Sequence, residues 1–247
     1  MDADRGRIWQ VDFLRGVAVV GMVIYHFLFD LEFIFQLPIG VYRMPLLLLA
    51  RTVATVFLLI VGFSAAIKFE RLKQGTIRKV VASFGKKAVF IFVPALLITG
   101  VTFATFPEQT VLLGILHFIA LSLVLIIPFL YIKSNRIVVA MGILFLYLGS
   151  IFSNLRTDHN CLLVFGITPY SFSSFDYFPI FPWFGIILLG LVLGRNNRLI
   201  FQDKSSVMVT PPSWFAGLMI MLGKHSLLIY LLHQPVLWTM LLIVKNL

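Results

Sequence analysis

The sequence has few charged residues and a single cysteine. Asp, Glu, Lys and Arg make up 12% of the 247 residues, about half of the roughly 25% that is usual in soluble domains. A soluble chain of this length must cover its surface with polar groups, so the shortage favours lipid as the surroundings of most of the chain. The lone Cys161 excludes a disulfide within the chain and argues against a metal site built on thiolates.

Motifs for nucleotide or metal chemistry are also missing. The sequence contains no Gly-rich phosphate loop, no serine nucleophile elbow, no Cys/His zinc spacing and no dinucleotide fingerprint. The net charge of +10 does not indicate a nucleic-acid partner, because the basic residues lie in short tracts between apolar runs, as topology signals do in membrane proteins. An anionic ligand must therefore bind to single Arg and Lys side chains and to helix ends.

Long apolar runs dominate what is present, with 60% hydrophobic residues and a mean hydropathy of +1.00. A helix that spans a bilayer needs roughly 20 such residues. The runs predict an all-α fold, a polytopic transmembrane helix bundle in a single domain over 1–247. A short run at 214–223 predicts an interfacial helix before the last span. About seven spans are expected, at 9–31, 46–68, 86–106, 111–132, 136–154, 179–195 and 225–245.

The distribution of Lys and Arg predicts the orientation. With the N-terminus in the cytosol, 15 of the 20 basic residues lie on the cytosolic side, in agreement with the positive-inside rule. The loop at 69–85 is then cytosolic. The nearly uncharged loop at 155–178 and the C-terminus face outward.

The first predicted span carries four ionisable residues on one stripe. At 100° per residue, Asp12, Arg15, His26 and Asp30 fall within about 60° of one another, and the stripe extends over roughly 27 Å. Each ionisable group at mid-membrane costs about 2.5–3.5 kcal/mol on insertion scales, so the stripe must face protein or water. Such a stripe indicates a pathway or a reaction site.

Two pairs on this stripe have different interpretations. Asp12 and Arg15, three residues apart, form either a structural ion pair near the inner interface or part of a binding site. His26 and Asp30 are four residues apart, so the carboxylate can orient the imidazole as a general base. The alternative for His26 is a hydrogen-bonded packing residue.

Two further polar residues lie at membrane depth in other spans. His117, at the predicted depth of His26, is a candidate for a second acid/base or a substrate contact, and equally for a packing residue. Two imidazoles without a nearby carboxylate are a poor metal site, so no metal is expected. Arg51 either pairs with Asp30, binds an anionic group of the substrate, or extends to the interface.

The last predicted span, with the residue before it, adds three candidates. Tyr230 and His233 project from one face and are candidate substrate contacts. Pro235 leaves the carbonyl of Leu231 without a helical partner, which often accompanies a functional bend. Lys224, at the cytosolic end, either meets phosphates of a donor or is an ordinary topology charge.

Together these residues resemble bacterial membrane proteins of the heparan-α-glucosaminide N-acetyltransferase catalytic-domain family, and more distantly the acyltransferase-3 enzymes. The resemblance covers essentially the whole chain, and the motif of the first helix is its most specific part. It also includes 114–118 and 177–185. The main matching stretches are Asp12-Phe13-Leu14-Arg15-Gly16 followed by His26, the run 57–64, and Leu228-Ile229-Tyr230-Leu231-Leu232-His233-Gln234-Pro235.

The resemblance implies a membrane acyltransferase of the cytoplasmic (inner) membrane. Cytosolic acyl-CoA, in particular acetyl-CoA, is then the donor, and a sugar of an envelope glycan or glycolipid is the acceptor. By position, Arg15 helps to hold the donor, and His26 takes the place of the reactive histidine of the acyltransferase-3 enzymes. The lysosomal enzyme of the family has its catalytic histidine on the loop after the first helix. Residues 32–40 contain none, so heparan-type specificity does not carry over.

Two other functions stay open at this point. In a small proton-coupled transporter the stripe would be an ion path, although transporters usually show paired repeats, and none is evident here. In a non-catalytic membrane subunit the charges would only pair helices. The sequence does not identify the acceptor, the acyl chain or a partner protein, and it leaves the oligomeric state, a dimer included, open.

Overall fold

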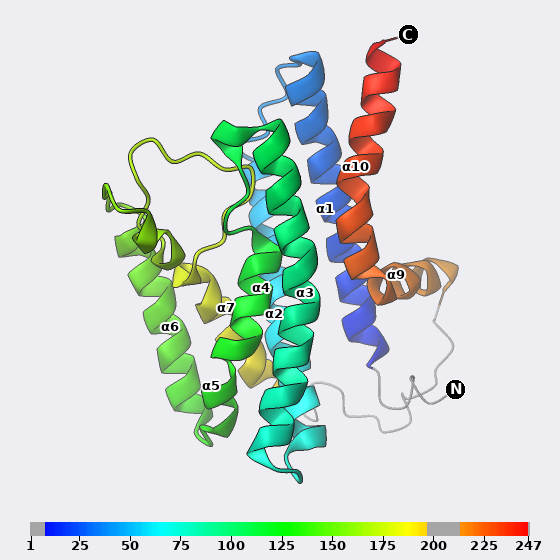
Figure 1. Ribbon diagram of the computed structural model, residues 1–247. Helices are drawn as coiled ribbons and strands as arrows, with labels where there is room; N and C mark the ends of the chain where they lie inside the picture. The colour runs from blue at the N-terminus through cyan, green and yellow to red at the C-terminus, as the bar shows by residue number, and fades with distance from the viewer. Residues whose placement is uncertain (1–7, 197–212, 247) are drawn as a thin grey trace. The chain divides into compact units, whose positions relative to one another are not determined.

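The computed structural model describes residues 8–196 and 213–246. Four of the basic residues counted for the orientation, Arg5, Arg7, Arg198 and Lys204, lie outside these ranges. Within them the chain consists of helices joined by loops, with no strand and only two isolated β-bridges (Figure 1). The predicted all-α helix bundle is confirmed.

Five helices in the described residues are long and apolar enough to cross a membrane, and they confirm five of the predicted spans. The second and third extend further than hydropathy indicated. Only 73–76 remains of the loop predicted at 69–85, because Lys and Arg are good helix formers even where they end an apolar run. The five are α1 (Trp9–Phe35), α2 (Leu46–Leu72), α3 (Ile77–Thr105), α6 (Asn135–Phe152) and α10 (Ser226–Lys245).

The other two predicted spans are shorter helices. The run 111–132 forms α4 (Ile115–Leu125) and α5 (Ile127–Tyr131). Pro128 lies in the first turn of α5, and because it has no N–H it cannot continue the hydrogen bonds of α4. The predicted span at 179–195 forms α7 (Ile180–Arg195). The short run for which an interfacial helix is predicted forms α9 (Trp214–Lys224).

The chain divides into two compact units, and the boundary falls inside α2. Unit 1 comprises residues 1–57 and 201–247, and unit 2 comprises residues 58–200. In unit 2, α3 packs on α4, and α6 packs on α7. The single domain over 1–247 stays a prediction.

The segment 155–178 of unit 2 is tied to the start of α4. It includes the short helix η2 (Asn160–Phe165), and η1 (Pro107–Gln109) precedes α4. Phe178 donates its N–H to the carbonyl of Leu113 at 2.7 Å, and the carboxylate of Asp176 accepts the N–H of Ile115 at 2.8 Å. The loop at 155–178 is therefore an ordered part of unit 2.

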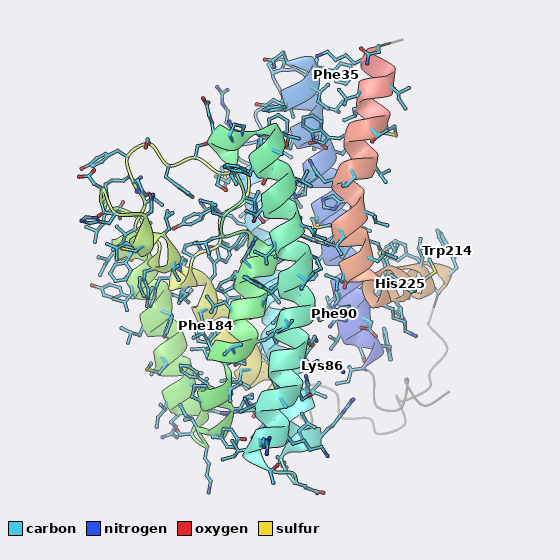
Figure 2. All side chains as sticks on the ribbon, viewed as in Figure 1. Phe35, Lys86, Phe90, Phe184, Trp214 and His225 are labelled. Atoms are coloured by element: carbon cyan, nitrogen blue, oxygen red, sulfur yellow. The ribbon has the colours of Figure 1, made fainter. Side chains whose placement is uncertain are left out.

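Unit 1 is built on α1, which contacts both C-terminal helices. Its N-terminal half is crossed by α9, and its C-terminal half runs beside α10 (Figure 1). Trp214 marks the start of α9, and His225 marks the turn between α9 and α10 (Figure 2). At the crossing the backbones touch, because a Cβ at Gly16 would lie 1.9 Å from the carbonyl oxygen of Met219.

Candidate active site

The ionisable stripe predicted for the first span lies on one uninterrupted helix, α1. At the N-terminal end of the stripe, Asp12 lies where α9 crosses. At the C-terminal end, His26 and Asp30 contact α10. One face of α1 therefore meets the two C-terminal helices along its length, as expected of a stripe that must avoid lipid.

At the N-terminal end, Arg15 donates from Nη1 to Oδ1 of Asp12 at 2.7 Å. Asp12 is buried, and the side chain of Arg15 is 22% exposed. The backbone of Gly223 lies against the carbonyl oxygen of Asp12, where a Cβ would come within 1.8 Å. Lys224 follows Gly223 directly, so the three predicted donor-binding residues lie at one helix crossing. Their role stays a prediction.

At the C-terminal end, Asp30 is fully buried. Its Oδ1 accepts hydrogen bonds from Nε2 of Gln234 at 2.7 Å and from Nε1 of Trp238 at 3.0 Å. Sequence reasoning did not single out either donor. The signal was their spacing of four residues, which puts both on one face of the last span.

His26 lies against His233 of α10, with ring centroids 4.9 Å apart and planes tilted by 58°. The expected arrangement, in which Asp30 orients His26, is not present. No hydrogen bond joins the two among the described residues. The carboxylate instead accepts from α10, whose amide and indole donors meet one oxygen at normal distances.

His233 is held by its own helix. Its Nδ1 lies 2.8 Å from the carbonyl oxygen of Tyr230 and 3.2 Å from that of Ile229. Carbonyl oxygens only accept, so Nδ1 carries the proton and Nε2 carries the lone pair. The ring of Tyr230 lies 5.7 Å from that of His233, so both predicted substrate contacts on α10 are at this end.

Three buried acceptor atoms at this end have no hydrogen-bond partner in the described structure: Oδ2 of Asp30, Oε1 of Gln234 and Nε2 of His233. Buried polar atoms in proteins nearly always have one. These three atoms can therefore accept hydrogen bonds from hydroxyl or amine groups of a bound molecule, or from water.

Arg51 does not pair with Asp30. Its side chain is exposed, it forms no ion pair within the described residues, and the donors to Asp30 are on α10. The last turn of α1 and the loop after it line an open cavity of about 230 Å³. The carboxylate of Glu32, in the last turn of α1, accepts the N–H of Val41 in the loop at 2.9 Å. The cavity is lined by Glu32, Pro38, Gly40, Tyr42 and Arg43.

His117 belongs to unit 2, where it is buried in α4. Its Nε2 lies 3.2 Å from the hydroxyl of Thr99, and its ring meets the ring of Phe92 at 5.8 Å. Thr99 donates its own hydrogen to the carbonyl of Val111 at 2.5 Å, so in the contact with Thr99 the histidine is the donor. These contacts match the packing interpretation, and a catalytic role for His117 stays a prediction.

In the described residues no group of three or more His, Cys, Asp or Glu side chains is placed to hold a metal ion. The polar residues of the candidate site can bind groups of an organic molecule. Cationic side chains lie at the N-terminal end of the stripe, and buried hydrogen-bond acceptor atoms lie at the other end.

A family model described as heparan-alpha-glucosaminide N-acetyltransferase, catalytic, matches residues 7–235. The chain belongs to this N-acetyltransferase family. The match includes both ends of the stripe and ends at Pro235, so it confirms the family that the sequence motifs indicated. No curated protein and no solved structure matches the chain. The family and the apolar helices make this chain a membrane protein of the acetyltransferase class.

Proposed function

We propose that this family member transfers an acetyl group from cytosolic acetyl-CoA to a sugar of an envelope glycan or glycolipid. The observation that carries the proposal is the division of one helix face. At the crossing with α9 this face of α1 carries the ion pair of Arg15 with Asp12. Beside α10 it carries His26, which faces His233, and Asp30, whose Oδ2 is buried without a partner in the described structure.

The cationic end suits the donor. Coenzyme A is a polyanion, and Arg and Lys bind phosphates by charge-assisted hydrogen bonds. Asp12 uses one Nη1 hydrogen of Arg15, which orients the guanidinium for other contacts. This assignment agrees with the cytosolic N-terminus and outward C-terminus that the count of basic residues predicts. It also agrees with the cytoplasmic membrane that the family resemblance implies.

The other end suits the acceptor. Sugar hydroxyls are hydrogen-bond donors, and this end holds buried hydrogen-bond acceptor atoms that have no partner within the described residues. The cavity after α1, with one carboxylate, one guanidinium and one phenol in its lining, offers polar groups of the kind that bind a sugar. His26 is the base that the sequence predicts, and Asp30 stands one turn away on α1.

Both competing functions are disfavoured by particular observations. Charges that only pair helices need partners, whereas Oδ2 of Asp30 is buried without one in the described structure. Transporter sites usually lie on helices that are broken at mid-membrane, whereas α1 is continuous from Trp9 to Phe35.

The test uses the full-length protein purified in detergent, with labelled acetyl-CoA and a panel of sugars and glycolipids. We expect saturable donor binding and acetyl transfer. His26→Ala removes one of the two facing imidazoles and should lower kcat by about 10²-fold, as misplacement of the neighbouring reacting groups does. His159→Ala changes an exposed histidine of the 155–178 loop and should leave the rate unchanged.

Two results would count against the proposal at different levels. If no acyl-CoA binds or turns over, the acyltransferase function is wrong. If the wild-type protein is active and His26→Ala keeps its full rate, the function stands and the reacting centre has been misplaced.

A further inference from the structure

We infer that His233, and not His26, is the general base that removes the proton from the acceptor. This inference rests on the proposed acetyl transfer and identifies the residue that performs its proton step. It follows from the hydrogen bonds of the two facing imidazoles.

A histidine base needs a lone pair on one ring nitrogen, while the other nitrogen is held as a donor. His233 has this arrangement. Its Nδ1–H is held by the carbonyls of Ile229 and Tyr230, so its Nε2 carries the lone pair. Nε2 is also buried without a partner in the described structure, so no described protein group uses its lone pair.

The two carbonyl oxygens that accept from Nδ1 of His233 belong to α10 itself. The two carbonyls stand three and four residues before His233 on the same helix, and each oxygen has two lone pairs, so it can serve the helix and the side chain together. The tautomer of His233 is thus set before any substrate binds. Such preorganisation lowers the cost of reaching the reactive geometry.

The ring of His26 is not held by a hydrogen bond of this kind within the described residues. No hydrogen bond is made by either of its ring nitrogens within the described residues, and its ring contacts are with His233 and with Tyr25, at 5.7 Å. Either tautomer of His26 therefore fits. The titratable groups near His233 are His26 and Asp30 from α1, and Tyr230 from α10.

In the proposed step, the hydroxyl or amine of the acceptor gives its proton to Nε2 of His233 while its heteroatom attacks the thioester carbonyl carbon. The tetrahedral intermediate then collapses and the carbon–sulfur bond breaks. The departing sulfur takes the proton back from His233, which becomes neutral again. The products are the acetylated acceptor and free coenzyme A, and no oxidant or metal is required.

The kinetic test compares His233→Asn with His26→Asn, with His159→Asn as the control in an exposed loop. Asparagine keeps an amide near the position of Nδ1 but has no basic lone pair at the position of Nε2. We expect His233→Asn to lower kcat by about 10²–10⁴-fold and to remove the acidic limb of the pH–rate profile. The dissociation constant of acetyl-CoA should stay within about twofold.

His26→Asn should lower the rate but keep the acidic limb, and His159→Asn should match the wild type. If His233→Asn keeps the limb while His26→Asn loses it, the base is His26 and the inference is overturned, with the proposed function intact. Absence of turnover in the wild-type protein instead contradicts the proposed function.

A second measurement keeps His233 and so does not depend on the folding of a variant at this position. The protein has five histidines, so nitrogen-15 NMR of histidine-labelled protein can resolve each imidazole. His233 is assigned by elimination with variants of the other four. We expect a protonated Nδ1 and an unprotonated Nε2 for His233 in the neutral form. The opposite tautomer would overturn the inference, whatever the activity.

Discussion

Gly16→Ala tests the helix crossing that unites the predicted donor-binding residues. A Cβ at position 16 would lie 1.9 Å from the carbonyl oxygen of Met219, whereas ordinary contact begins at 3.4 Å. The obstacle is backbone, which cannot rotate away as a side chain can. We therefore expect α9 and α1 to separate by about 1.5 Å at this point.

This separation has two consequences of predictable size. Overpacking of a close contact usually costs about 1–3 kcal/mol, so the melting temperature in detergent should fall. Arg15 precedes Gly16 on α1, and Lys224 follows Gly223 on α9, so the two cations move apart. A misplacement of about 1 Å can cost on the order of 10²-fold in an enzyme, and we expect weaker acetyl-CoA binding and slower transfer.

The assay measures melting temperature and donor affinity for Gly16→Ala beside two control variants. Gly85 and Gly100, both in α3, have open space where a Cβ would stand, with no neighbouring atom within 4 Å. Alanine there should leave donor binding unchanged and raise stability slightly, by about 0.5–1 kcal/mol, because glycine is a poor helix former. If Gly16→Ala melts and binds donor like the wild type, the close crossing is refuted.

Two further predictions concern buried hydrogen bonds. Trp238→Phe removes one of the two donors to Asp30 and should cost about 1–3 kcal/mol; an equal melting temperature in Trp238→Phe and in Trp214→Phe, whose indole is 82% exposed, would contradict this. The part-buried hydroxyl of Tyr177 donates to the carbonyl of Leu163 at 2.6 Å, and burial raises the pKa of Tyr177 from 10.0 to about 12. The neutral phenol therefore stabilises the folded protein fully below pH 10, and this contribution is lost as the pH rises to 12. Tyr177→Phe should therefore flatten the melting temperature between pH 10 and 12, whereas Tyr170→Phe, at an exposed position, should not.

Hydropathy and helical geometry predicted the spans that depend on local features. A run of apolar residues must form a helix in lipid, because every backbone polar group has to be paired within the segment. α1, α2, α3, α6 and α10 follow this rule. Where a helix could extend past its apolar run, as α3 does towards Ile77, hydropathy had no information on its end.

The same local geometry located the stripe on α1, since the angular positions of Asp12, Arg15, His26 and Asp30 depend only on their spacing. It did not determine which groups this face would meet. The spacing of His26 and Asp30 suggested that they bond to each other. In the structure the carboxylate accepts from Gln234, 204 residues away in the chain.

Contacts of this kind depend on how α10 packs on α1. The partners of Asp30, the facing rings of His26 and His233, and the approach of Gly16 to Met219 all join segments from opposite ends of the chain. No periodicity within one segment specifies the rotation or register of another. Apolar length and spacing therefore determined the helices and the polar face of α1, whereas helix packing alone decided which of its residues became a site.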